Sequence, residues 1–257
     1  MNSFDKNLKA GKFIIENVSK TYVQTRNNVK EYKEVLKNIN IKIFENEITV
    51  IVGKSGCGKT TFLKIIAGLE KATEGKVKYL DSENNEKDVK IGVVFQEPRL
   101  MPWLTVEKNI KIHEKKDSSE KIDIEKILSL VSLNNIENMY PHELSGGMAS
   151  RVAIARAIAY NPHILLMDEP FAALDYFTRA QLQNEIIKIH QETKTGIIFV
   201  THNIDEAILI GKRIIVFTEN NNGKNKYEEF VINKSYPRDM GDTELINIKK
   251  EILNRLV

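Results

Sequence analysis

The sequence predicts an α/β fold with a mixed, mostly parallel β-sheet, and three observations lead to this expectation. Short apolar runs of strand length alternate with stretches whose apolar residues recur at helical spacing. One glycine-rich loop joins such a strand directly to such a helix. Residues 36–43 alternate apolar and polar residues instead, which is typical of a half-buried antiparallel strand. A chain with these features is expected to build a parallel core and a smaller antiparallel part.

The composition is that of an ordinary globular protein, with 42% hydrophobic and 28% charged residues among 257. The net charge of +3 is too small to predict a nucleic-acid-binding surface. No apolar run approaches the ~18 residues of a membrane span, and residues 1–6 lack the apolar stretch of a secretory signal. Cys57 is the single cysteine, which excludes an internal disulfide and fits a reducing compartment. We therefore expect a cytoplasmic location, with any membrane role through a partner.

The first half of the chain is expected to contain most of the strands. They are predicted at residues 13–15, 36–43, 48–52, 77–80 and 91–95. The polar residues 23–34 are predicted to form a loop, and a turn is expected at residues 81–85. A helix should begin near Phe62 and end at Gly68, because glycine adopts the left-handed conformation common after helix C-termini.

The second half is expected to be largely helical at first and then to alternate. Helices are predicted at residues 106–112 (capped by Thr105), 124–131, 148–160, 179–193 and 243–256. The helix at 148–160 is apolar nearly all round and should be buried. Central parallel strands are predicted at 164–167 and 197–200, and a hairpin is predicted around Asn222-Gly223, with strands at 214–218 and 227–232.

The glycine-rich loop matches the phosphate-binding pattern G-x-x-x-x-G-K-[ST] in the strand–loop–helix setting that the pattern requires. Its backbone N–H groups would line a concavity at a helix N-terminus, where the helix dipole also favours a phosphate. Lys59 can reach the β- and γ-phosphates, and the Thr60 hydroxyl can bind Mg²⁺. A chance match occurs in roughly one chain per hundred of this size. The predicted nucleotide-binding residues are Gly53, Lys54, Ser55, Gly56, Cys57, Gly58, Lys59, Thr60 and Thr61.

Three further apolar strands end on polar side chains that suit phosphate chemistry: Gln96, then Asp168 with Glu169, then His202. Ligands of open α/β sheets bind beyond the carboxyl ends of the strands, so parallel neighbours would bring these groups to one γ-phosphate. Asp168 is predicted to hold Mg²⁺ through its water shell, and Glu169 to accept a proton from the attacking water. Gln96 can touch the metal and orient that water. His202 can hydrogen-bond the γ-phosphate and hold Glu169.

These residues also have less specific interpretations. An isolated Asp-Glu pair after a strand is usually part of a solvated loop, and an isolated histidine is usually structural. For Glu169 and His202 the accompanying phosphate loop favours the catalytic interpretation. The remaining histidines are expected to be structural: His113, His142, His163 and His190.

A second glycine turn, Ser145-Gly146-Gly147, precedes the buried helix. Ser145 can cap the helix, and the free N–H groups of the turn can bind another oxyanion. No lysine accompanies this turn, so a flexible helix start without a ligand is an equally weighted alternative.

Residues 144–148 resemble the signature motif of ATP-binding cassette (ABC) ATPases, with Met148 where most members carry Gln. Other motifs follow in that family's order over about residues 12–235: the Tyr22 loop, the phosphate loop, Gln96, residues 164–169, Ala173-Leu174-Asp175 and His202. The resemblance implies a P-loop NTPase core with an antiparallel β subdomain and an inserted helical subdomain. It also implies a homodimer across two ATP molecules, in which the signature turn of one subunit closes over ATP on the phosphate loop of the other. Tyr22 would stack on adenine, and Asp175 would lie at the dimer seam.

The domain organisation that this resemblance implies is a single ABC ATPase domain over residues 1–257. The nucleotide-binding core is expected at residues 1–97 and 161–235, with a helical and signature subdomain at 98–160. Residues 236–257 would form a C-terminal helical tail.

Residues 95–106 resemble importer ATPases for nitrate, sulfonate, taurine and related compounds, although Ser150 stands where those relatives usually show Gln. This resemblance implies an ATPase subunit on the cytoplasmic face of the membrane. It would power a transmembrane permease pair fed by a solute-binding protein, and no nucleic-acid partner is expected. Residues 99–104 would grip a helix of the permease, with a small satellite core as the alternative.

Two other functions remain open from the sequence. One is a soluble ABC ATPase acting on ribosomes or nucleic acid, although such proteins usually carry two cassettes or long coiled-coil insertions. The other is a regulator that binds ATP without hydrolysing it, which Glu169 and His202 argue against. The transported solute touches no residue of this chain, so the sequence does not identify it.

Overall fold

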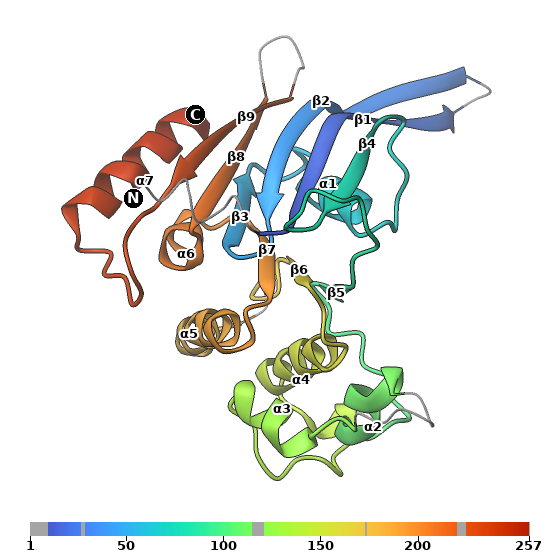
Figure 1. Ribbon diagram of the computed structural model, residues 1–257, viewed down its shortest axis with the longest axis vertical. Helices are drawn as coiled ribbons and strands as arrows, with labels where there is room; N and C mark the ends of the chain where they lie inside the picture. The colour runs from blue at the N-terminus through green and yellow to red at the C-terminus, as the bar shows by residue number, and fades with distance from the viewer. Residues whose placement is uncertain (1–9, 27–28, 115–120, 173, 220–224, 257) are drawn as a thin grey trace. The chain divides into compact units, whose positions relative to one another are not determined.

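The computed structural model describes residues 10–26, 29–114, 121–172, 174–219 and 225–256 (Figure 1). The chain divides into two compact units, the first made of residues 1–88 and 199–257 and the second of residues 89–198. The polypeptide therefore leaves the first unit once and returns to it once.

An antiparallel sheet forms one part of the first unit. It contains β1 (Lys12–Arg26), β2 (Val29–Phe44) and β4 (Glu74–Leu80), in the order β2-β1-β4 with both pairings antiparallel. The apolar residues of β2 are buried: Leu36, Ile39, Ile41 and Ile43. The predicted half-buried antiparallel strand is therefore confirmed.

The loop predicted at residues 23–34 is wrong for the described residues, because the strands continue through most of it. β1 extends to Arg26 and β2 begins at Val29, so the two strands form a long two-stranded ribbon (Figure 1). Val23 and Tyr32 pair across this ribbon and are 55% and 69% exposed. A ribbon exposed on both faces needs no apolar alternation, so the sequence pattern resembled that of a loop.

The first unit also contains the strand that leads into the phosphate loop. β3 (Ile48–Gly53) is buried throughout and pairs in parallel with β8 (Arg213–Glu219), which pairs antiparallel with β9 (Asn225–Val231). Strand β7 (Gly196–Thr201) is divided between the two units, and its residues from Phe199 on belong to the first unit. The strand order in the first unit is β7-β3-β8-β9. The two strands of the predicted hairpin are confirmed, and Asn222-Gly223 lies outside the described residues.

Helix α1 (Lys59–Ile66) follows the phosphate loop and ends as the sequence predicts. Gly68 has φ +70°, and its N–H donates to the Ile65 carbonyl at 3.1 Å. The Leu69 N–H donates to the Lys64 carbonyl at 2.9 Å. These two bonds satisfy carbonyls that the last helical turn leaves open, and they require the left-handed residue between them.

Two helices complete the first unit: α6 (Ile204–Ile210) and α7 (Thr243–Leu256). Helix α7 packs on α6 and β8 (Figure 1), and Leu245 and Ile252 are fully buried there. The amphipathic helix predicted at residues 243–256 is confirmed.

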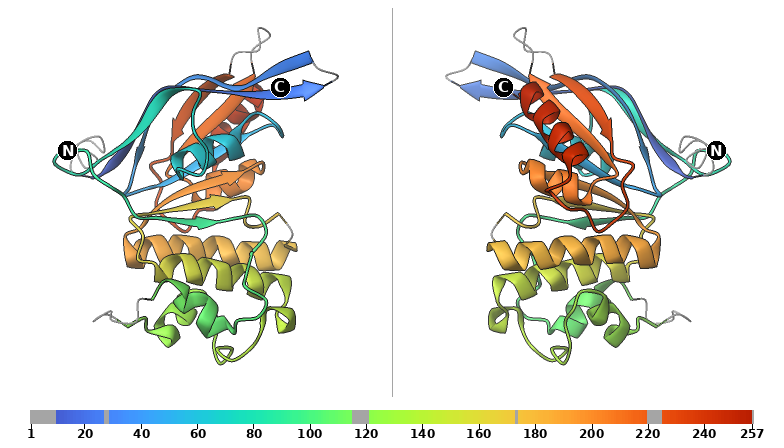
Figure 2. Two further views of the ribbon diagram at one scale, coloured as in Figure 1. Left: turned by 90° about the vertical axis from the view of Figure 1, so that its right-hand side faces the viewer. Right: turned by 90° about the vertical axis from the view of Figure 1, so that its left-hand side faces the viewer.

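The second unit combines the other parallel strands with most of the helices. β5 (Ile91–Val94) pairs in parallel with β6 (Ile164–Asp168), and the first residues of β7 follow in the order β5-β6-β7. The longest helices are α4 (Gly146–Ala159) and α5 (Tyr176–Thr193), which run alongside each other in Figure 2. The shorter helical segments are α2 (Val106–Ile110), η2 (Lys111–His113), α3 (Ile124–Leu130) and η3 (Pro141–Glu143).

Local capping explains where these helices begin. The Thr105 side chain accepts a hydrogen bond from the Lys108 N–H and caps α2, as expected, although the helix tightens to a 3₁₀ turn after Ile110. Helix α4 is buried on most of its surface, as its apolar composition predicts. Helix α5 begins three residues before the predicted Arg179, because Asp175 caps it.

None of the helices in the described residues is both long and apolar enough to cross a lipid bilayer. The domain boundaries expected from the sequence, with a helical subdomain at residues 98–160, stay a prediction.

Candidate functional site

The phosphate loop follows the carboxyl end of β3 in the first unit and has a backbone that requires glycine. Gly56 has φ +83° and Gly58 has φ +99°, in the left-handed region that side chains rarely adopt. A Cβ on Gly58 would lie 2.8 Å from Leu36 Cδ2, and a Cβ on Gly53 would lie 2.6 Å from the Phe217 carbonyl oxygen. The loop is therefore curled tightly between β2 and β8.

Lys59 is the first residue of α1, and its side chain turns back over this loop. Its Nζ donates to the Gly53 carbonyl at 2.9 Å and to the Lys54 carbonyl at 3.0 Å. Thr60 and Ser55 are exposed, whereas Cys57 is buried. The loop thus presents a hydroxyl, a lysine ammonium and glycine backbone at one helix N-terminus, which is a donor set for phosphate.

Tyr22 and His202 belong to the same unit as the phosphate loop. Tyr22 is half-buried on β1, and the Lys20 ammonium lies 4.9 Å from the centre of its ring. His202 is exposed and directly follows β7. Its turn is held by two hydrogen bonds, from the Thr201 hydroxyl to Glu206 Oε2 at 2.6 Å and from the Asn203 N–H to Thr201 Oγ1 at 3.0 Å.

Gln96, Asp168 and Glu169 lie at the carboxyl edge of the β5–β6 pair in the second unit. The two strands are parallel and Val94 pairs with Met167, so the chain leaves both strands at the same edge. Asp168 and Glu169 are half-buried, and Gln96 is exposed. These three residues therefore lie at one edge of the β5–β6 pair, and their convergence with His202 and the phosphate loop on one γ-phosphate stays a prediction.

Glu169 has φ +45°, which is uncommon for a residue with a side chain and costs free energy. Its carbonyl accepts a hydrogen bond from the Ala172 N–H at 3.2 Å, which closes a turn. Asp168 is the last residue of β6, and the turn redirects the chain at Glu169, immediately after the strand.

The signature turn and Asp175 share one cavity of about 500 Å³ in the second unit. Ser145 caps α4 by accepting a hydrogen bond from the Met148 N–H at 3.2 Å. Asp175 caps α5 and accepts from the Phe177 and Thr178 N–H groups at 3.0 and 3.1 Å. Two capped helix N-termini therefore open into the same cavity. In the sequence analysis these two helix starts belong to separate motifs.

Sequence reasoning missed Thr178 and Arg151, which connect these two helices. A Cβ on Gly147 would lie 2.9 Å from Thr178 Cγ2, and the Thr178 hydroxyl donates to Asp175 Oδ2 at 2.6 Å. Arg151 is buried and pairs with Glu185 at 3.0 Å. Burial raises the pKa of Glu185, while Arg151 acts in the opposite direction. The spacing Asp-x-x-Thr at a helix start was the one available signal, since both types favour helix N-termini.

Ser150, which departs from the pattern that the family resemblance implies, lies one helical turn into α4. Its hydroxyl donates to the Gly146 carbonyl at 3.1 Å, one helical turn back. The hydroxyl therefore bonds within its own helix, to the carbonyl of a residue of the signature turn.

A rigid loop at residues 98–104 presents Trp103, which is 71% exposed. The fully buried Asn109 accepts from the Met101 N–H at 2.8 Å, and its amide donates to the Leu104 carbonyl at 3.0 Å. Arg156 donates to the carbonyls of Pro98 and Arg99 at 2.9 and 2.8 Å. An exposed tryptophan on a backbone held this firmly suits recognition better than a satellite core.

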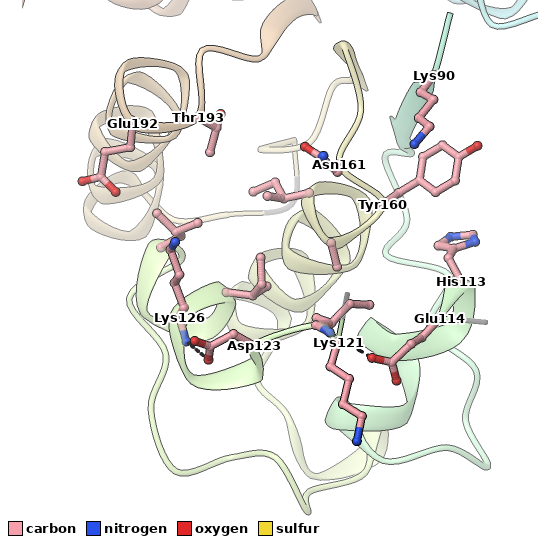
Figure 3. A pocket seen from close by; sticks show the side chains of 15 residues that line it. Lys90, His113, Glu114, Lys121, Asp123, Lys126, Tyr160, Asn161, Glu192 and Thr193 are labelled. Carbon is pink, nitrogen blue, oxygen red and sulfur yellow. Dashed lines mark hydrogen bonds between the residues drawn. The ribbon is translucent and has the colours of Figure 1, made fainter. Parts of the chain in front are cut away.

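A second cavity of about 700 Å³ lies in the same unit beside Lys90, which immediately precedes β5 (Figure 3). Its polar lining includes three lysines and three carboxylates, so their formal charges cancel: Lys90, Lys121, Lys126, Glu114, Asp123 and Glu192. None of the residues that the sequence predicts for nucleotide binding is among the described residues that line it.

The described residues contain no cluster of three or more His, Cys, Asp or Glu side chains suited to a metal ion. The Thr60 hydroxyl, the Gln96 amide and the Asp168 carboxylate are oxygen donors of the kind that Mg²⁺ prefers. Within the second unit, the Gln96 and Asp168 oxygens fit a Mg²⁺ ion that completes its shell with phosphate and water oxygens.

The glycine-curled loop between a buried parallel strand and α1, with Lys59 folded over it, defines a P-loop nucleotide-binding protein. More specifically, residues 36–172 match the family model described as ABC transporter, and the chain belongs to that family. It is thus an ABC ATPase that binds ATP or ADP, and the expected fold class and family are confirmed.

Individual relatives are similar over nearly the whole chain. An ABC transporter ATP-binding protein of Methanocaldococcus jannaschii is 46% identical over 95% of this chain and 91% of its own. The aliphatic sulfonates import ATP-binding protein SsuB of Bacillus cereus is 42% identical over 94% of both chains. A dimeric structure of the cassette MJ0796, in a post-hydrolysis state with ADP and Pi, has a TM-score of 0.71 at 34% identity, covering 87% of this chain and all of that one.

Proposed function

We propose that this chain is the ATP-hydrolysing subunit of an ABC importer for small solutes, with aliphatic sulfonates as the first candidates and nitrate- or taurine-like anions as related ones. It would act as a homodimer across two ATP molecules on the cytoplasmic face of a membrane, bound to permease subunits. A solute-binding protein would feed the permease from the other side. Similarity to SsuB importer ATPases over 94% of the chain supports the solute class.

One observation carries the dimer mechanism: the chain has two glycine turns of different composition at helix N-termini. The first, at residues 53–61, has its own lysine, which folds over the loop. The second opens at Ser145 into a cavity shared with Asp175 and has no lysine. A second turn of this kind has a purpose if it closes over a γ-phosphate that the lysine of another copy already holds.

In this proposal the residues of the first unit bind the nucleotide. The backbone N–H groups of residues 53–61 cradle the phosphates, and Lys59 neutralises the β- and γ-oxygens. Tyr22 stacks on the adenine. His202 hydrogen-bonds the γ-phosphate from the turn after β7.

The residues of the second unit act on the attacking water. Glu169 accepts the proton from that water, and Gln96 orients it. Gln96 and Asp168, together with Thr60 of the first unit, would hold Mg²⁺, which would neutralise charge on the phosphates when bound. Asp175 lies at the seam between the two copies.

Trp103 and its rigid loop are proposed to dock on the permease. The hydrogen bonds of Asn109 and Arg156 hold this loop, so movement at Gln96 can be transmitted to it through the connecting segment. Nucleic acid is not proposed as a partner, because the net charge is only +3.

The variant Glu169→Gln tests the catalytic role directly. Its amide cannot accept the proton, so we expect ATP binding to be retained and phosphate release to fall by about 10²–10⁴-fold. ATP should then trap the dimer, which gel filtration detects. Glu125→Gln on the exposed face of α3 removes one carboxylate elsewhere and serves as the control.

A variant Glu169→Gln that releases phosphate at the wild-type rate would exclude Glu169 as the base. A wild-type chain that binds ATP and releases no phosphate, even with its permease, would favour the nucleotide-gated regulator instead.

The solute class has its own test, in a cell that lacks an SsuB-type ATPase and is given an aliphatic sulfonate as its sulfur source. Growth with the wild-type chain and not with Glu169→Gln supports sulfonate import. No growth, despite hydrolysis in vitro, indicates another solute.

A further inference from the structure

Lys20 on β1 is a buried lysine whose ammonium is held by the segment that follows α1. Its Nζ donates to Glu70 Oε1 at 2.6 Å and to the Lys71 carbonyl at 2.8 Å. Only 11% of its side chain is exposed. Lysine is rarely buried unless it is paired, so these two acceptors explain its burial and fix the position of its charge.

The same ammonium lies over an aromatic ring. Its Nζ is 4.9 Å from the ring centre of Tyr22, within the distance at which a cation is attracted to a ring face. Lys20 and Tyr22 are two residues apart on β1, so their side chains point to the same side of the strand. One face of Tyr22 is therefore covered by a charge that cannot move away freely.

This arrangement is also tied to the phosphate loop. Lys20 pairs across the sheet with Leu36, whose Cδ2 would lie 2.8 Å from a Cβ on Gly58. Lys20 pairs with Leu36 and Thr21 with Glu34, so the pairing register skips Val35 on β2. The Val35 carbonyl oxygen would lie 2.9 Å from a Cβ on Gly58. Lys20, which holds the Tyr22 ring, is thus connected to the phosphate loop through its strand partner Leu36.

We propose that Lys20 is a positioning residue for the nucleotide base, which holds the Tyr22 ring from one face so that the other face is presented to adenine. This inference rests on the proposed function, in which Tyr22 stacks on adenine. A ring that is already oriented loses less conformational freedom when the base binds. A cation behind the ring also draws electron density from the stacking face, which reduces the repulsion between two electron-rich rings.

The variant Lys20→Met removes the charge and keeps an apolar stem of similar length. Glu70 remains 32% exposed at its side chain, so water can solvate it. Lys20→Arg keeps a cation that can stack on the ring. Glu70→Gln is the matched control for the ion pair, because it removes the partner's charge and leaves Lys20 beside Tyr22.

The decisive measurement compares the affinity for ATP with the affinity for inorganic triphosphate, which has no base. We expect Lys20→Met to weaken ATP binding by about three- to tenfold and to leave triphosphate binding unchanged. Lys20→Arg should restore most of the ATP affinity, and Glu70→Gln should have a smaller effect than Lys20→Met. In the Tyr22→Ala background, Lys20→Met should cause no further loss of ATP affinity.

Equal weakening of ATP and triphosphate would show that Lys20 supports the loop as a whole and would overturn the inference. So would a Lys20→Met effect of the same size with and without Tyr22, or no effect at all. The proposed role of Tyr22 fails separately, if Tyr22→Ala leaves the ratio of the two affinities unchanged. Circular dichroism of each variant identifies any that does not fold. If Lys20→Met does not fold, Lys20→Gln takes its place, because it also removes the charge and can still hydrogen-bond to the Lys71 carbonyl.

Discussion

Gly147 in the first turn of α4 lies directly against Thr178 in the first turn of α5. A Cβ on Gly147 would stand 2.9 Å from Thr178 Cγ2, closer than side chains normally approach. Thr178 has little freedom to rotate away, because its hydroxyl donates to Asp175 Oδ2 at 2.6 Å. The signature turn and the cap of α5 are therefore held together by a contact that only glycine allows.

The substitution Gly147→Ala should accordingly destabilise the fold by about 1–3 kcal/mol, the usual cost of overpacking. Gly146→Ala is the matched control, since a Cβ there meets nothing within 4 Å. That variant should be neutral or stabilised by up to about 1 kcal/mol, because alanine favours helix more than glycine does. Thermal unfolding without nucleotide measures both.

A second substitution isolates the contact. Thr178→Ser removes Cγ2 and keeps the hydroxyl for Asp175, so it should recover most of the stability that Gly147→Ala loses. If the double variant is no more stable than Gly147→Ala alone, the clash with Cγ2 is not the cause of the loss.

Gly58 and Gly56 give a similar comparison within the phosphate loop. Both have positive φ, so alanine at either position costs about 1–2 kcal/mol of backbone strain. At Gly58 the Cβ would also lie 2.9 Å from the Val35 carbonyl oxygen, a backbone atom, whereas at Gly56 it meets nothing within 4 Å. Gly58→Ala should therefore lose about 1–3 kcal/mol more than Gly56→Ala in denaturant unfolding. Equal losses would mean that β2 moves aside at no cost.

Local chemistry was sufficient to predict most elements of this fold from the sequence. The apolar runs before Gln96 and Asp168 predicted two parallel strands, and the structure pairs them with Val94 opposite Met167. Thr105 and Ser145 cap helices because a side-chain oxygen can reach an N–H two or three residues on, which depends on neighbours alone. The phosphate loop was recognisable because glycine and lysine requirements fall within one short segment.

The features that sequence reasoning missed depend on residues far apart in the chain. The contact of Gly147 with Thr178 and the pairing of Arg151 with Glu185 exist only because α4 and α5 lie alongside each other. The ribbon through Val23 and Tyr32 was missed because its hydrogen bonds need no buried face. The catalytic roles of Glu169 and His202, which the sequence motivated, remain predictions.

The ionisation of Asp175 offers a test of the α5 cap. The pKa of this carboxyl is lowered, first by the hydrogen bond from the Thr178 hydroxyl and then by the N–H groups of Thr178 and Phe177. All of these donors bind the ionised form. The stabilisation is therefore present above the ordinary pKa of 3.8, and it is lost as the pH falls through the lowered value in the folded chain.

Thr178→Val removes the hydroxyl and keeps the shape of the side chain, including its contact with Gly147. We expect the pKa of Asp175 to rise towards its ordinary value, because the largest of the interactions that lower it is gone. An NMR titration of the Asp175 carboxyl carbon measures this shift. As the pH is lowered, protonation of Asp175 weakens its bond to the Phe177 N–H, so protection of this amide from exchange should be lost at a higher pH than in the wild-type chain. Thr193→Val, which removes a hydroxyl bonded to the Ile189 carbonyl at the other end of α5, should leave the pKa of Asp175 unchanged. An unchanged titration in Thr178→Val would mean that the backbone N–H groups alone hold the carboxylate in its ionised form.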